Sequence, residues 1–417
     1  LTGFIDVSGA AAANYGFTAN PNQYFIPSTP TLPSTFDLAF TDPNYKFPQM
    51  WKTNLAVDQK LPLGLIFSVE LLINKSINAV HYYNANLDQA TSSFKGPDFR
   101  PRYAGTDNGV RINDNVSMAA VLTNRNGPYY TGLTFKIEKP YSKGFWGSLA
   151  WTTSKAFDYM SAGSIASGSW TGARSVDGNN RLSLTASDNN IPNRIVGLAG
   201  YRLQYGNEYG GATTFTLGYV GQVASPFTYA YAGDMNGDRV SNNDLIYIPT
   251  ESEVGLTRFA ANTLSSTVSG NSFSYAYSEA EQRTALNAYI EQDPYLSKHR
   301  GQYASRNGLT LPALHRVDFS VAQDFYFNVK GMKNTLQVRF DILNFGNLLN
   351  KYWGVSQRAT AANLLNFQSV NAGGEPVFKL AGQRLADGRN ILARDTYQYN
   401  SSVFDVWQAQ LGVRYIF

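Results

Sequence analysis

The last eleven residues of the chain, WQAQLGVRYIF (407–417), alternate between apolar and polar side chains. Every second residue from Leu411 to Phe417 is apolar or aromatic, whereas Gln410 and Arg414 belong to the alternate set. Successive side chains of a β-strand point to opposite faces. The stretch therefore predicts a strand with one apolar face and one polar face.

The same period of two recurs along the rest of the chain. Eight further segments show it, at residues 50–60, 65–74, 130–139, 145–154, 194–204, 213–222, 316–324 and 336–342. Most of them are about ten residues long, which is the length that a tilted strand needs to cross a bilayer. The pattern predicts about nine strands of membrane-spanning length.

The composition agrees with a membrane protein built from strands. Charged residues make up 15% of the chain, whereas Tyr and Phe number 27 and 25; soluble domains average roughly 25% charged residues. No run approaches the roughly 18 apolar residues of a spanning helix. The net charge of +4 is not gathered into basic clusters, so we expect no nucleic-acid partner. The absence of cysteine excludes a disulfide framework and a thiolate metal site.

The lengths of the connections alternate in the manner of an outer-membrane barrel. Four connections are short, at 61–64, 140–144, 206–210 and 327–334, whereas the segments 77–127, 157–192, 223–313 and 347–402 are long and 1–50 precede the first strand. Such barrels have short periplasmic turns and long extracellular loops. We predict an all-β protein, a transmembrane antiparallel β-barrel in the lipid bilayer of the bacterial outer membrane, with these five long segments outside. The alternative is a large soluble sandwich or propeller.

The number of predicted strands bears on the extent of the barrel. Nine is odd, whereas single-chain bacterial barrels have even numbers of strands and cannot leave an unpaired edge in lipid. The first residues, LTGFIDVSG (1–9), also lack the basic and apolar regions of a signal peptide. We therefore expect residues 1–417 to be the C-terminal portion of a larger barrel.

Several segments resemble TonB-dependent outer-membrane transporters. The end of the chain, QAQLGVRYIF (408–417), resembles the insertion signal that the barrel-assembly machinery reads, with Tyr415 and Phe417 as its aromatic residues. LQVRFDILNFGNLLNKYWG (336–354) is similar to the penultimate-strand region of these transporters. RGQYASRNGLTLPALHRVDFSVAQDF (300–325) and GDMNGDRVSNNDLIYIP (233–249) resemble the Oar-like branch, which is common in Bacteroidetes.

The resemblance implies a 22-stranded barrel with an N-terminal plug and a periplasmic segment that contacts TonB. Transport would be energised by the TonB–ExbB–ExbD complex of the inner membrane. The plug and the TonB-contacting segment have no counterpart in this sequence. The function that we expect is transport of a bulky solute or a polypeptide. The alternative is a surface barrel that acts in adhesion or in docking a lipoprotein or a secreted or surface protein.

The stretch 233–249 is dense in oxygen-bearing side chains. Its candidate metal ligands are Asp234, Asn236, Asp238, Asn242 and Asp244. The first four match positions 1, 3, 5 and 9 of an EF-hand-type calcium loop, but Arg239 replaces the usual glycine and Asp244 comes one residue before the expected acidic ligand. Two interpretations stay open, which are a calcium site and a loop of Asx turns satisfied by its own backbone.

The longest predicted loop contains a helix signal. SEAEQRTALNAYIEQDP (278–294) begins with a capping box, Ser278 with Glu281, and continues with an apolar stripe through Leu286 and Tyr289. We predict a short helix there that packs on neighbouring loops. Aromatic residues of the loops that could stack on a sugar or peptide are Trp170, Tyr229, Tyr231 and Trp353.

The polar faces of the predicted strands carry charges of both signs. The candidates that face the lumen are Lys52, Asp58, Glu70, Lys136, Glu138, Arg194, Arg202, Asp318, Arg339, Asp341 and Arg414. We expect most of them to form structural pairs. With three histidines and no known catalytic motif, we expect no enzymatic activity and no cofactor apart from the calcium considered above.

Overall fold

The computed structural model describes residues 18, 20, 23, 35–105, 109–206 and 209–417. Its largest sheet has ten strands, nine of them long. In spatial order the long strands are β2 (Gln49–Leu61), β3 (Leu65–Ile77), β8 (Tyr129–Ser142), β9 (Phe145–Asp158), β11 (Asn193–Gln204), β12 (Gly210–Gln222), β20 (Leu314–Val329), β21 (Met332–Leu343) and β28 (Gln408–Ile416), and β10 (Thr185–Ala186) pairs with β9. The nine segments of alternating residues coincide with these nine strands.

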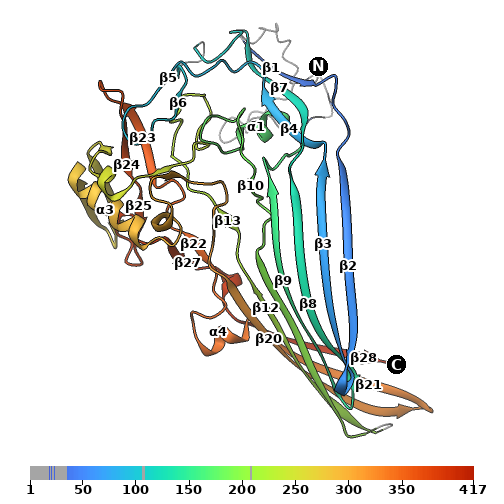
Figure 1. Ribbon diagram of the computed structural model, residues 1–417. Coiled ribbons are helices and arrows are strands. Elements are labelled where there is room, and N and C mark those ends of the chain that lie inside the picture. The colour runs from blue at the N-terminus through green and yellow to red at the C-terminus, as the bar shows by residue number, and fades with distance from the viewer. Residues whose placement is uncertain (1–17, 19, 21–22, 24–34, 106–108, 207–208) are drawn as a thin grey trace.

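Neighbouring long strands are antiparallel throughout. They form a curved wall in Figure 1, and the shorter elements gather at one end of it. Among the described residues the sheet does not close on itself, because β2 and β28 each have a neighbour on one side only. The structure therefore shows an all-β wall and does not show the closed 22-stranded barrel.

Tight turns join the strands at the opposite end of the wall. Lys143 and Gly144 connect β8 to β9, and Lys330 and Gly331 connect β20 to β21; all four residues have φ between 52° and 86°. Two consecutive positive φ values suit the right-handed twist of a two-residue hairpin, and glycine adopts them without strain. The helical turn η2 (Pro62–Gly64) joins β2 to β3. The short connections thus lie at one end, and the long ones at the other.

The register sorts the side chains of the wall onto two faces. Phe340 of β21 lies opposite both Val321 of β20 and Leu411 of β28, and the last is 69% exposed. The opposite face carries polar pairs such as Gln337 with Arg414. An apolar face of this extent would promote aggregation in water. We call it the outer face and the polar one the inner face.

The long connections fold into a layer that we call the cap, comprising residues 78–128, 159–192, 223–313 and 344–407. Its strands are β4 (Ala79–Asn84), β5 (Ser92–Ser93), β6 (Pro101–Arg102), β7 (Val116–Arg125), β13 (Pro226–Phe227), β14 (Tyr247–Ile248), β15 (Arg258–Phe259), β16 (Asn262–Val268), β17 (Asn271–Tyr277), β18 (Gln302–Tyr303), β19 (Leu309–Thr310), β22 (Gln357–Ala359), β23 (Leu365–Val370), β24 (Pro376–Leu380), β25 (Gly382–Arg384), β26 (Asn390–Leu392) and β27 (Tyr397–Tyr399). Its helices are α1 (Ala166–Thr171), α2 (Glu251–Val254), α3 (Glu279–Gln292), α4 (Phe345–Leu349), η3 (Leu296–Lys298) and η4 (Val403–Asp405).

The main buried core lies in the cap and not in the wall. Its most enclosed members include Tyr229, Ile248, Leu286, Tyr289 and Leu364, which come from two of the four long connections, and Phe94 of a third connection also belongs to it. The cap therefore has a core of its own. No helix among the described residues is long and apolar enough to cross a membrane.

The helix predicted in the longest loop is confirmed as α3. Its N-cap Ser278 accepts from the Glu281 backbone, and the Glu281 side chain accepts from the Ser278 backbone. Leu286 and Tyr289 of its apolar stripe are buried in the cap core.

The segment expected to be the extracellular loop 1–50 contains secondary structure in its described part. β1 (Phe36–Thr41) pairs in parallel with β7 of the cap, and β2 begins at Gln49. Apart from residues 18, 20 and 23, residues 1–34 lie outside the described part of the chain. β1 adds an edge to a cap sheet, an association between distant segments that the alternation pattern does not encode.

Candidate functional site

The acidic loop at 234–244 is folded by hydrogen bonds to its own backbone. Asp234 accepts from the amides of Gly237 and Arg239, both at 2.9 Å. The side chain of Asn236 accepts from the Asp238 amide, and that of Asp238 from the Val240 amide, each at 2.9 Å. These are Asx turns, in which a side-chain oxygen replaces a backbone acceptor.

Asp244 joins this loop to a second segment of the cap. The carboxylate is fully buried, and one oxygen accepts from the amides of Met235 and Asn236 at 3.0 and 3.1 Å. Its other oxygen lies 3.5 Å from an Nη of Arg100. The loop therefore ends at a buried ion pair with a residue 144 positions earlier.

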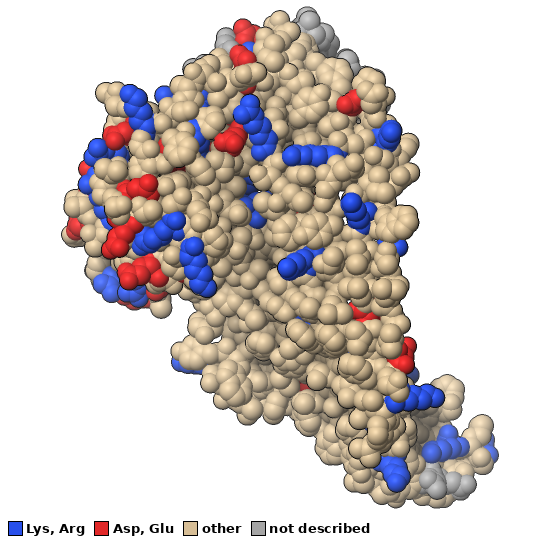
Figure 2. All heavy atoms as spheres, in the orientation of Figure 1, with Lys and Arg blue, Asp and Glu red and all other residues tan. Residues whose placement is uncertain are grey.

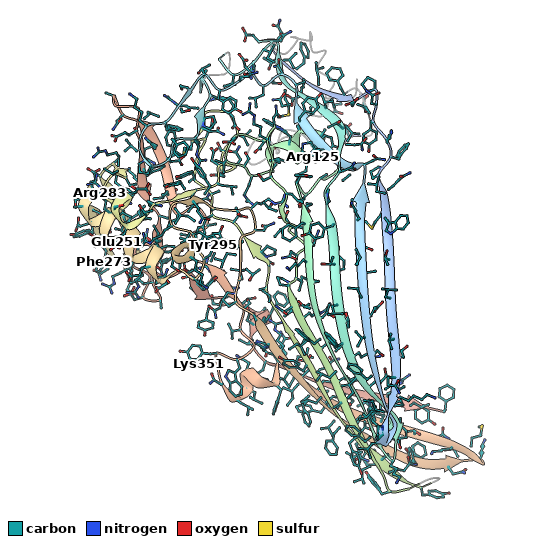
Figure 3. All side chains as sticks on the ribbon, in the orientation of Figure 1. Arg125, Glu251, Phe273, Arg283, Tyr295 and Lys351 are labelled. Carbon is teal, nitrogen blue, oxygen red and sulfur yellow. The ribbon has the colours of Figure 1, made fainter. Side chains whose placement is uncertain are left out.

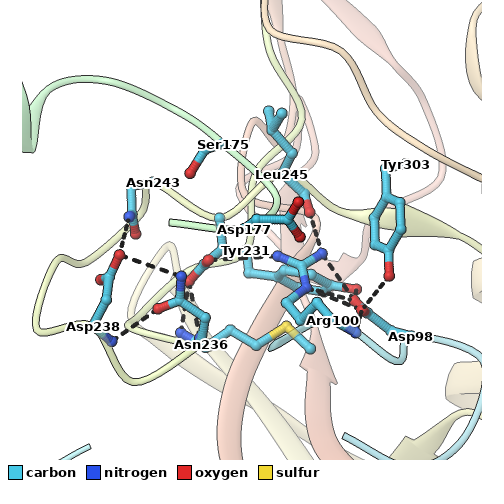
Figure 4. Close-up of polar contacts among 12 residues, drawn as sticks. Asp98, Arg100, Ser175, Asp177, Tyr231, Asn236, Asp238, Asn243, Leu245 and Tyr303 are labelled. Atoms are coloured by element: carbon cyan, nitrogen blue, oxygen red, sulfur yellow. Dashed lines mark hydrogen bonds and ion pairs between the residues drawn. The ribbon is translucent and has the colours of Figure 1, made fainter. Parts of the chain in front are cut away.

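Arg100 is the centre of a buried polar cluster, drawn in Figure 4. Its guanidinium pairs with Asp98 at 2.9 Å and also donates to the Leu245 carbonyl. It lies over the rings of Tyr231 and Tyr303, 5.0 and 5.2 Å from their centroids. The hydroxyls of both tyrosines donate to Asp98, at 2.9 and 3.1 Å. The cluster joins the connection between β13 and β14, and Tyr303 of β18, to the segment around Asp98.

The electrostatics of the cluster follow from burial. Burial raises the pKa of Asp244 to about 7; Arg100 opposes this shift and the charge of Asp238 adds to it. Burial likewise raises the pKa of Asp238 to about 6, and Asp234 contributes further repulsion. For Arg100, burial is the largest single effect and lowers the pKa, but Asp98, Tyr231 and Asp244 together outweigh it, and the net shift of the pKa is upward. The guanidinium therefore stays charged, and burial together with repulsion between the neighbouring carboxylates raises the pKa of Asp238 and Asp244.

The structure brings together four of the five predicted metal ligands and sets Asn242 apart. Asn242 is exposed and its side chain accepts from the Gly233 amide at 3.0 Å. Its neighbour Asn243 is buried and donates to Asp238 at 3.2 Å, while its Oδ1 has no hydrogen-bond partner in the described chain. The described residues contain no group of three or more His, Asp or Glu arranged to hold a metal. Calcium at this loop stays a prediction.

The prediction that four loop aromatics are available to stack on a ligand is wrong for three of them. Trp170, Tyr229 and Tyr231 are each 1% exposed. Trp170 donates to Asn180, and Tyr229 packs in the cap core. Only Trp353, which is 57% exposed, could stack on a ligand. Aromatic side chains of long loops are expected at the surface when the loops have no hydrophobic core. The loops of this cap do have such a core, and it buries Tyr229 and Tyr231.

Five of the eleven charged residues predicted to face the lumen lie in ion pairs of the described structure, namely Lys136, Glu138, Arg202, Arg339 and Asp341. Arg202 lies 2.7 Å from Asp324 and donates to the Tyr326 hydroxyl at 2.6 Å. Arg339 pairs with Asp341 at 2.7 Å, and Lys136 pairs with Glu138. Asp324 was absent from the predicted set although it continues the alternation of Asp318, Ser320 and Ala322. The Asp98–Arg100 pair, by contrast, had no sequence signal.

The residues of the predicted insertion signal end the wall. Tyr415 stacks on Phe327 and Phe417, with centroids 6.1 and 5.8 Å apart. Its hydroxyl donates to Asn334 of the neighbouring strand at 2.5 Å. Phe417 is 93% exposed at the end of the chain. Both aromatic side chains are thus available on the outer surface.

A polar cleft of about 480 Å³ opens among the hairpins of the cap. It is lined by Ser265, Ser266 and Thr267 of β16, Arg358 and Thr360 at β22, Gly382, Arg384, Gly388 and Asn390 at β25–β26, and Gln398 of β27. Its lining contains two arginines and no carboxylate. Guanidinium groups bind carboxylates and phosphates through paired hydrogen bonds, and hydroxyls and amides bind sugars or peptides. The cleft suits an acidic, hydroxyl- or amide-rich solute.

Comparison with known protein families shows which family the chain belongs to. A family model described as "Outer membrane beta barrel domain" matches residues 4–364. The search of curated proteins gave no match, and neither did the search of solved structures.

Proposed function

Because the chain belongs to the outer membrane beta-barrel domain family, we propose that it is the receptor portion of a TonB-dependent transporter of the Oar-like branch. The family also places the protein in the outer membrane. The proposed cargo is a bulky solute or a polypeptide. TonB–ExbB–ExbD would supply the energy, and the barrel-assembly machinery would insert the wall.

The observation that carries the proposal is the single folded cap at one end of the strand wall. A channel needs no buried core outside the membrane, whereas a receptor needs a shaped surface that holds its ligand. Here three of the four long connections share the main apolar core, and a buried ion-pair cluster around Arg100 links two of them. Figure 2 shows acidic and basic side chains gathered over the lobe that carries α3, with few over the strands. These features support a rigid receptor surface above a membrane wall.

The polar cleft supports a small-scale contact site for the cargo. Rigid hairpins hold its hydroxyls and guanidinium groups, and the Asn390 amide donates to Ser266 at 3.2 Å across the junction of two hairpins. A site on rigid elements binds with less loss of conformational entropy than one on free loops. We place the first contact of an acidic solute there.

Loss of TonB tests the proposal directly. Cells that carry the intact protein are screened for uptake of labelled oligosaccharides and peptides, with and without TonB. We expect binding to the cell surface to persist and uptake to fall to background without TonB, since energy and not affinity is removed. Uptake at the same rate in both strains would overturn the proposal.

The second candidate function is adhesion or docking of a lipoprotein or secreted protein. The observation that favours it is the hairpin β16–β17, whose Phe273 and Tyr275 are 45% and 54% exposed. Figure 3 labels Phe273 at the outer side of the α3 lobe. Retention of a protein ligand by the cap, with no uptake in either strain, would favour this function.

A further inference from the structure

A small lobe at the cap side of β21 and β28 has an inverted distribution of side chains. We call residues 344–356 and 402–407, which include α4 and η4, the α4 lobe. Its polar residues Asn344 and Asp405 are 4% and 5% exposed. Its apolar residues Leu349, Trp353 and Phe404 are 65%, 57% and 76% exposed. In a water-soluble element the two groups would change places.

Hydrogen bonds inside the lobe hold this arrangement. The Asn344 side chain donates to the carbonyls of Gly354 and Asp405, at 3.1 and 3.0 Å. The Asp405 carboxylate accepts from Arg316 and from the Ser356 amide, both at 3.0 Å. These bonds connect α4, the turn after it, η4 and β20. The outward apolar side chains are therefore a fixed surface and not the result of a frayed segment.

The lobe lies against the outer face of the wall. Phe345 of α4 packs on Phe319 of β20, with ring centroids 5.7 Å apart. Phe319 is two residues from Val321, which lies opposite Phe340, so it shares the apolar face of these residues. Trp353 and Val317 line one cleft of about 350 Å³ beside the lobe. The lobe thus continues the apolar surface of a wall that belongs to an outer-membrane family.

The far side of the lobe carries a cation. The Lys351 ammonium lies 5.1 Å from the ring centroid of Tyr352, and Figure 3 shows Lys351 beside α4, away from the wall. Tyr352 also borders a second cleft, of about 460 Å³. Aromatic rings and long basic side chains suit the boundary between acyl chains and charged headgroups, since each has an apolar body and a polar end.

We propose that the α4 lobe binds lipid of the outer leaflet. Acyl chains cover Leu349, Trp353 and Phe404, and Lys351 lies at the level of the headgroup phosphates. Continuity with the outer face favours lipid over a protein partner, because membrane lipid already covers the outer face of the neighbouring strands. Burial of this surface in the membrane removes the unfavourable contact with water that its composition would otherwise impose.

The chain has no cysteine, so single labelled cysteines can report the surroundings of the lobe. Leu349→Cys and Phe404→Cys are each spin-labelled in the protein reconstituted into vesicles of phosphatidylethanolamine and phosphatidylglycerol. Phe340→Cys is the control on the outer face of the wall, and Tyr275→Cys is the control on the cap hairpin. Collision with oxygen reports lipid, and collision with a water-soluble nickel chelate reports water.

We expect the labels at 349 and 404 to collide with oxygen as often as the label at 340 does, and severalfold less with nickel than the label at 275. A label at Lys351→Cys should lie shallower than the one at 349. Labels at 349 and 404 that match the hairpin control would overturn the proposal. Labels shielded from both reagents would also overturn it, because they would show a protein covering the lobe.

Discussion

Arg100 shows how one residue can hold together segments that are distant in the chain. Its guanidinium is enclosed and is shared by Asp98 and Asp244. Removing one partner of a buried ion pair leaves the other charges desolvated without compensation. We therefore expect the organisation of the cap to depend strongly on this one cation.

Replacement of Arg100 tests that dependence. We expect Arg100→Leu to destabilise the cap by about 3–5 kcal/mol, because Asp98 and Asp244 would stay buried without their counter-charge. Faster proteolysis of the cap, with the strand wall intact, is the measurement. The control is Arg389→Leu, which breaks an exposed pair with Asp387 and should change stability little, because water screens such a pair. Equal rates for the two variants would contradict the prediction.

Calcium removal tests the acidic loop. We propose that calcium binds Asp234, Asn236 and Asp238, so that EGTA lowers Tm by a few degrees through the loss of linked binding energy. Asp238→Asn should lower Tm in calcium and abolish the effect of EGTA. Titration with magnesium separates a calcium site from a general ionic effect. An unchanged Tm would show that the Asx turns alone satisfy the loop.

At the scale of the elements, the C-terminal strand β28 combines a structural role with a proposed signal. It is the last strand of the wall in spatial order. On its outer face, the hydroxyl of Tyr415 donates to Asn334 of β21. Phe417 makes one ring contact, with Tyr415, and is otherwise exposed. Its side chain thus contributes little to packing and is free for recognition during assembly.

Truncation of this side chain separates recognition from stability. We expect Phe417→Ala to lower the amount of protein assembled in the outer membrane severalfold, while the Tm of the assembled fraction stays the same. Heat-modifiable mobility on gels measures assembly. Phe325→Ala, which removes a ring 48% exposed on the same face of β20, should leave assembly near the original level. Equal assembly of both variants would exclude the insertion signal.

At the scale of the whole molecule, the wall and the cap have different structural roles. The wall presents apolar side chains to lipid and pairs its inner charges with one another, as Arg202 does with Asp324. The cap carries the buried core and the polar cleft. We therefore expect the two parts of the proposed function, binding of a cargo and its TonB-driven movement, to be separable.

Substitutions in the cleft test this separation. We expect Arg358→Ser combined with Arg384→Ser to weaken binding of an acidic solute at least tenfold, since each lost charged hydrogen bond contributes about 1.5–3 kcal/mol. Loss of TonB should leave binding unchanged. The control is Arg394→Ser, which removes an exposed arginine paired with Asp395 and so tests the effect of losing positive charge elsewhere in the cap. A double variant that binds every screened acidic solute like the original would exclude the cleft as the contact site.

Sequence alone determined the local features of this protein. Alternation of apolar and polar residues located the nine long strands and the face of each side chain, because the period of a strand is independent of its neighbours. The lengths of the connections located the end with the large excursions, and the capping box of Ser278 and Glu281 located α3.

Only the tertiary structure decided what depends on distant contacts. Tyr229 and Tyr231 look like surface aromatics in the sequence, but they are buried in a core to which three of the long connections contribute. Arg100 meets Asp244 across 144 positions, and no local pattern marks either residue as a partner. The inverted α4 lobe is visible only once Asn344 and Asp405 are seen to face inward. Burial is set by packing between segments, whereas strand periodicity is set within one.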